Sequence, residues 1–113
     1  MKDDAIYLQH ILEAITRIVS FIGGSEYPAF SRDEKTSAAV LHELMVIGEA
    51  AAAMSQHFRE QHPEIPFYEI IGMRNRIVHE YLEVRLETVW QTYEKDLPEL
   101  KRHVKKALAE LGN

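Results

Sequence analysis

The sequence contains no cysteine, and it has only five glycines and four prolines in 113 residues. Without cysteine, disulfide scaffolds, zinc fingers and enzymes with a thiolate nucleophile are excluded. Strictly apolar runs extend over only a few residues, far short of the ~18 needed to span a bilayer. The chain begins Met1-Lys2-Asp3-Asp4, with acids where a signal peptide carries cations. We therefore expect a cytoplasmic protein with no membrane contact.

Basic residues are scarce in the first half of the chain. The formal net charge is -5, and residues 1–64 carry five Lys and Arg against ten Asp and Glu, whereas residues 65–113 carry eight of each. A protein that binds nucleic acid by broad counterion release is basic overall. We therefore expect no non-specific coating of duplexes, and any contact with RNA or DNA must come from a local group of cations in the second half.

Helical periodicity is present along most of the chain. Apolar residues recur at spacings of three and four in segments 5–22, 33–61, 67–78 and 86–111. Small residues at 48–53 allow another helix to approach the second segment closely. Pro98 lies inside the last segment, so we expect a kink or restart near Asp96. The sequence predicts a single all-α domain over residues 1–113, an antiparallel bundle of four main helices.

Chemically active side chains interrupt the apolar pattern of the third helix, in the run Gly72-Met73-Arg74-Asn75-Arg76-Ile77-Val78-His79-Glu80-Tyr81. A guanidinium is a rigid fork that binds phosphate, and an imidazole titrates near neutral pH. Arg74 and His79 therefore supply the two parts of a metal-free phosphodiester cleavage. His79 would act as general base or acid, and Arg74 would hold the scissile phosphate. Asn75 and Arg76 would orient His79 and add positive potential.

The spacing of Arg74 and His79 raises a geometric question, because at ~100° per residue they lie about 140° apart on an unbroken helix. Either the helix ends near His79 and the chain swings round, or a second subunit supplies the missing group. Leu and Val alternate in Tyr81-Leu82-Glu83-Val84. An extended chain there would place the side chain of Tyr81 on the same side as that of His79.

A structural role for the same residues stays open. An arginine on an apolar stripe can pair with a buried glutamate, here Glu49 or Glu43, and a histidine near a helix C-terminus can interact with the helix dipole. Tyr81 could likewise pack with Ile70 and Ile71.

The string Arg74-x-x-x-x-His79-x-Tyr81 resembles the R-x4-6-H signature of the HEPN superfamily. Further segments resemble its HepT-like branch: Ile47-Gly48-Glu49-Ala50, Ile71-Gly72-Met73-Arg74-Asn75-Arg76, His79-Glu80-Tyr81, Val89-Trp90 and Asp96-Leu97-Pro98-Glu99-Leu100. The resemblance implies a homodimeric, metal-independent endoribonuclease toxin of a type VII toxin–antitoxin system. It also implies restraint by a minimal nucleotidyltransferase antitoxin that adenylylates Tyr81. Relatives tend to have Phe-Gly-Val-Asp where this chain has Leu82-Glu83-Val84-Arg85, which replaces a helix cap with a cation.

The alternative function is a catalytically silent HEPN-type module that docks a nucleotidyltransferase partner or a nucleotide without cutting RNA. No metal or cofactor is expected, since His57 and His62 lie five residues apart and do not align on one side of a helix as a metal-binding pair would. The basic segment 101–106 either interacts with the helix dipole or contacts phosphate.

Overall fold

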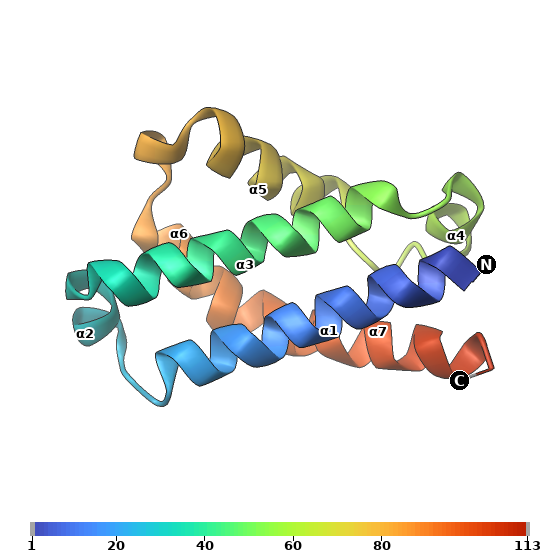
Figure 1. The fold of residues 1–113 in the computed structure, drawn as a ribbon, viewed down its shortest axis with the longest axis horizontal. Helices are drawn as coiled ribbons and strands as arrows, with labels where there is room; N and C mark the ends of the chain where they lie inside the picture. Colours follow the sequence, from blue (N-terminus) through green and yellow to red (C-terminus); the bar gives the residue numbers. More distant parts are fainter. Residues whose placement is uncertain (1, 113) are drawn as a thin grey trace.

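The computed structural model describes residues 2–112, which form helices and turns without any strand (Figure 1). The elements are α1 (Lys2–Ile22), α2 (Tyr27–Arg32), α3 (Glu34–Ala53), α4 (Gln56–Gln61), α5 (Phe67–His79), the 3-10 turn η1 (Tyr81–Glu83), α6 (Leu86–Gln91), the π-helical turn η2 (Thr92–Asp96) and α7 (Leu97–Glu110). The all-α bundle expected from the sequence is confirmed. Its four main helices are α1, α3, α5 and the continuous run α6–η2–α7.

The hydrophobic core centres on α1, which packs against α3 and α7. Leu8, Ile11 and Ile18 on its inward side are fully buried. By length and composition alone the helix could cross a membrane, since Asp3–Ile22 has a mean hydropathy of 1.3. In this fold its apolar side forms the middle of the bundle. Figure 1 shows α5 on the other side of α3 from α1 and α7, so α5 rests mainly on α3.

The single helix expected over 33–61 is wrong, because the helix breaks after Ala53. The buried carboxylate of Asp4 accepts hydrogen bonds from the backbone N–H and the hydroxyl of Ser55, at 2.9 and 2.8 Å. The Ser55 hydroxyl in turn accepts the Phe58 N–H at 3.1 Å and begins α4. The Ser55 hydroxyl thus caps α4, and Asp4 at the far N-terminus binds that cap through a contact that the local periodicity does not reveal.

The irregularity expected near Asp96 is confirmed. Residues Thr92–Asp96 form a π-helical turn, in which the Leu97 N–H bonds to the Thr92 carbonyl. Pro98 follows in the first turn of α7 and has no N–H to donate. The helix accommodates the missing N–H of Pro98 by forming one wider, π-helical turn before it.

Candidate active site

Arg74 is anchored where α5 approaches α3 closely. A β-carbon added at Gly48 would overlap the β-carbon of Arg74 and lie 3.2 Å from the Ile70 carbonyl oxygen. The close helix approach expected from the small residues of α3 is therefore confirmed. It fixes the root of the Arg74 side chain against α3.

Two oxygen atoms hold the guanidinium of Arg74. Its Nη1 lies 2.9 Å from Glu49 Oε1, and its Nε donates to Asn75 Oδ1 at 2.7 Å. The Arg74 side chain is 18% exposed. Of the two glutamates considered as a structural partner of Arg74, Glu49 is the one that pairs with it. Glu43 pairs with Arg17 instead, at 3.1 Å. Since a guanidinium has five N–H donors, these contacts leave donors for a phosphate.

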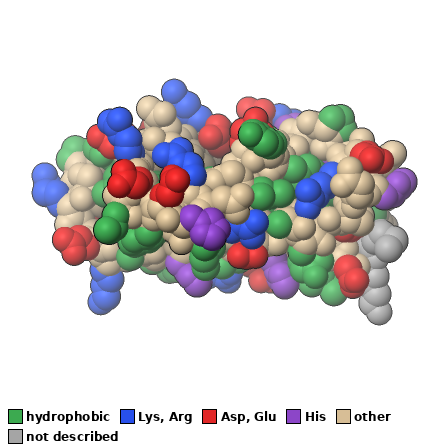
Figure 2. Space-filling view, turned by 90° about the horizontal axis from the view of Figure 1, so that it is seen from above, with side chains coloured by type: hydrophobic (Ala, Val, Ile, Leu, Met, Phe, Trp, Pro, Cys, Tyr) green, Lys and Arg blue, Asp and Glu red, His purple; other side chains and the backbone are tan. Residues whose placement is uncertain are grey.

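His79 is the last residue of α5, and it is exposed. Glu80 leaves the helical conformation at φ -136° and ψ 44°, so α5 ends at His79, as the first of the two arrangements requires. Asn75 and His79 are four residues apart and share one side of α5. The Nε of Arg74 therefore donates to a side chain on the side of α5 that carries His79. Figure 2 looks onto the α5 side of the molecule and shows basic, acidic and histidine side chains adjoining near its middle.

The role of Asn75 differs from the one expected. It bonds to Arg74 rather than orienting His79, and within residues 2–112 the His79 side chain makes no hydrogen bond or ion pair. The physical reason is proximity, because the Asn75 oxygen lies beside a guanidinium that can only donate. Asn75 therefore orients the guanidinium of Arg74.

The extended chain expected after His79 is wrong, because Tyr81–Glu83 form the 3-10 turn η1. Leu82 and Val84 do not share a buried side, because Leu82 is 93% exposed and only Val84 packs against the core. Tyr81 is 48% exposed and lies beyond the end of α5, so it does not extend the apolar stripe of that helix. Its phenol ring is accessible two residues after His79.

The cation at Arg85 has a local consequence. It precedes α6, and no side-chain hydrogen bond caps that helix. Arg85 instead lies 3.8 Å from Glu87 at the surface.

A shallow hollow on the outer side of α5 brings further cations near the site. Arg76 and Arg59 line it together with Tyr68 and Gly72. The guanidinium of Arg59 also lies over the Phe67 ring, 5.8 Å from its centroid. Sequence reasoning missed Arg59 and Tyr68. A stripe along one side of α5 was visible in the sequence, because spacings of four and three residues link Tyr68, Gly72, Asn75 and His79.

The sequence pattern of the family described as "Ribonuclease HepT-like" matches residues 11–107. The chain belongs to the HepT-like ribonuclease family. This family member is 36% identical over 108 residues to a protein of Caldanaerobacter subterraneus subsp. tengcongensis that is named provisionally as an RNase, and the match covers 96% of each chain. It is 39% identical over 95 residues to a probable ribonuclease HepT of Thermococcus cleftensis, covering 84% of this chain and 86% of that one. No solved structure matches significantly. The HEPN resemblance is confirmed, and family membership supports an RNase activity.

Proposed function

We propose that this HepT-like protein is a metal-independent endoribonuclease toxin of a type VII toxin–antitoxin system. The observation that carries the proposal is the Arg74 guanidinium, which Asn75 and Glu49 hold with donors to spare, five residues before the exposed His79 at the end of α5. A phosphate bound by Arg74 would lie within reach of an exposed imidazole at the helix end.

The reaction needs two proton transfers. A base removes the proton of the ribose 2′-OH, the 2′-oxygen bonds to phosphorus, the bond from phosphorus to the 5′-oxygen breaks, and an acid protonates that leaving oxygen. His79 performs one transfer, a role worth roughly 10²–10⁴ in rate. Arg74 stabilises the charge that builds on the non-bridging oxygens. The products are a 2′,3′-cyclic phosphate and a 5′-hydroxyl, so DNA is not a substrate.

The experiment is RNA cleavage by the purified protein in excess EDTA. We expect His79→Ala and Arg74→Ala each to abolish cleavage and growth inhibition while the helical circular dichroism is kept. His10→Ala is the matched control, because His10 is an exposed histidine on α1, away from α5. Cleavage at the wild-type rate by both site variants would show that the assignment is wrong.

A homodimer built around α5 would complete the site. Exposed apolar side chains gather on α5 and η1, with Tyr68 87% and Leu82 93% exposed and Val78 half exposed. A two-fold contact there would gather Arg74 and Arg76 of both chains in one cleft and supply a second imidazole. Sedimentation should show a dimer at micromolar concentration, and a stable, fully active monomer would contradict this part of the proposal.

Tyr81 is the proposed control point for a minimal nucleotidyltransferase antitoxin. Its accessible phenol lies two residues from His79, so an attached adenylate would add bulk and negative charge where the RNA phosphate binds. Tyr81→Phe should keep most of the cleavage but escape neutralisation by the partner and ATP. Intact mass spectrometry checks the site. Adenylate mass that persists in Tyr81→Phe would assign the modification to another residue.

One observation favours the alternative of a catalytically silent module that docks such a partner. The carboxylate of Glu49 is already paired with Nη1 of Arg74, where it competes with a phosphate. Partner binding and Tyr81 modification without any RNA cleavage would support that module in place of the nuclease.

A further inference from the structure

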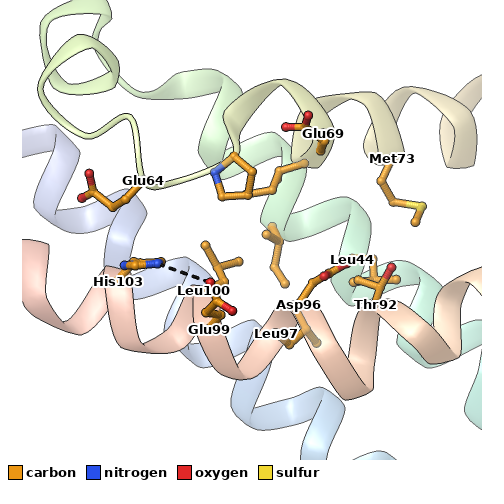
Figure 3. Close-up of a pocket in the computed structure, with 13 residues that line it drawn as sticks. Leu44, Glu64, Glu69, Met73, Thr92, Asp96, Leu97, Glu99, Leu100 and His103 are labelled. Atoms are coloured by element: carbon orange, nitrogen blue, oxygen red, sulfur yellow. Dashed lines mark ion pairs between the residues drawn. The ribbon is translucent and has the colours of Figure 1, made fainter.

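A groove runs between α5 and α7 and is lined by neither Arg74 nor His79 (Figure 3). Its volume is about 440 Å³, and α3 forms its back wall. The floor is apolar and consists of Leu44, Ile47, Ile70, Met73, Leu97 and Leu100. The groove exists because α5 packs on α3 and leaves α7 uncovered on this side.

The rim of the groove is acidic. Figure 3 shows Glu64 and Glu69 on one side, and Asp96 and Glu99 on the other. All four residues are exposed, and no Lys or Arg lines the groove within residues 2–112. His103 lies 3.9 Å from Glu99 and is the one basic side chain among the lining residues. An apolar floor between carboxylates is complementary to a molecule with an apolar stripe flanked by cations.

The shape of the groove suits a helix. The wall formed by η2 and α7 extends from Thr92 to His103, which is about 16 Å or three helical turns. Both ends of the π-helical turn, Thr92 and Asp96, belong to this wall. Such turns occur often at functional sites. Met73, whose side chain adapts readily to different shapes, lies in the floor.

We propose that this groove docks a basic amphipathic helix of a partner protein. Leucine-type side chains at i, i+3 or i+4, and i+7 would fill the floor, and flanking Lys or Arg would pair with the rim. The proposal goes beyond RNA cleavage and does not depend on it. A second copy that docks through the same groove is disfavoured as the occupant, since a two-fold contact there would place the acidic rim against itself. Because Ile70 and Met73 lie on α5, the bound helix would contact the helix that carries Arg74.

The test uses a fluorescent synthetic helix of Leu and Lys, with all leucines on one side, and measures anisotropy at physiological salt. The wild-type protein should bind it saturably. Glu69→Lys with Asp96→Lys should weaken binding about tenfold. Glu13→Lys with Glu94→Lys is the matched control, because it changes the net charge equally at exposed acids that do not line the groove. Circular dichroism checks that both variants fold.

Selective loss of affinity in the groove variant, together with no binding of a peptide whose leucines are scrambled around the helix, would support the proposal. Equal loss in both variants, equal binding of the scrambled peptide, or no binding by the wild type would overturn it. Displacement of the peptide by spermidine would instead assign the groove to a small cation. Loss of peptide affinity at rising protein concentration would assign it to a second copy.

Discussion

Two helical glycines in this protein should respond oppositely to the same substitution. Gly→Ala in a helix interior stabilises by roughly 0.5–1 kcal/mol when nothing opposes it. At Gly72 the new β-carbon meets open space, so Gly72→Ala should gain that amount. At Gly48 the new β-carbon would overlap Arg74 Cβ and lie 2.8 Å from Arg74 Cγ. Because α5 must move away, overpacking of about 1–3 kcal/mol outweighs the helical gain.

We therefore expect Gly48→Ala to lower the free energy of unfolding by about 1–2 kcal/mol, and Gly72→Ala to raise it. Urea titration followed by circular dichroism measures both. Displacement of Arg74 should also reduce RNA cleavage in Gly48→Ala. If Gly48→Ala stabilises the protein as much as Gly72→Ala does, the close approach of α5 to α3 is wrong.

Three further substitutions test separate contacts. Asp4→Ala removes a buried carboxylate that accepts two hydrogen bonds, so urea titration should show a loss of about 2–3 kcal/mol, with exposed Asp3→Ala near neutral; equal effects would contradict the contact with Ser55. Hydrogen bonds from Thr36 lower the pKa of Asp33. The ionised Asp33 carboxylate therefore stabilises α3 fully at pH values above the pKa that Asp33 has in the unfolded chain, and this stabilisation is lost as the pH falls through its lower pKa in the folded protein. The difference in unfolding free energy between wild type and Asp33→Ala should therefore close in acid; a difference that widens there would refute the cap. Glu49→Gln removes a negative charge beside Arg74 but keeps an oxygen for it, so KM for RNA should fall while kcat stays within about twofold; a higher KM would show that Glu49 does not compete with phosphate.

Local periodicity predicted much of the fold, because most helices here bury a regular apolar stripe. The irregularity before Pro98 was also predictable, since proline removes a donor at a known position. The helix end at His79 was one of two arrangements that the spacing of Arg74 and His79 left open. The break after Ala53 was not, because it depends on Asp4, which lies 51 residues away from Ser55 in the chain. Local pattern contains no information about such a contact.

The site was predictable in its residue types but not in its contacts. The residue types of Arg74 and His79 predict phosphodiester chemistry, and the small residues around Gly48 indicated a close helix approach. That Asn75 would bond to Arg74 depends on side-chain rotamers, which the sequence does not specify. The turn after His79 was wrongly expected to be extended, because Leu82 is apolar yet faces solvent.

The central claim is that Arg74 and His79 cut RNA through the ribose 2′-OH without a metal. The most direct measurement uses a short RNA and the same strand with a single 2′-deoxy nucleotide on the 5′ side of the cleaved bond, both in excess EDTA. We expect the RNA to yield a 2′,3′-cyclic phosphate by mass spectrometry and the substituted strand to stay intact at that position. Cleavage of the substituted strand at the same rate, or activity that disappears with EDTA and returns with a divalent cation, would contradict the claim.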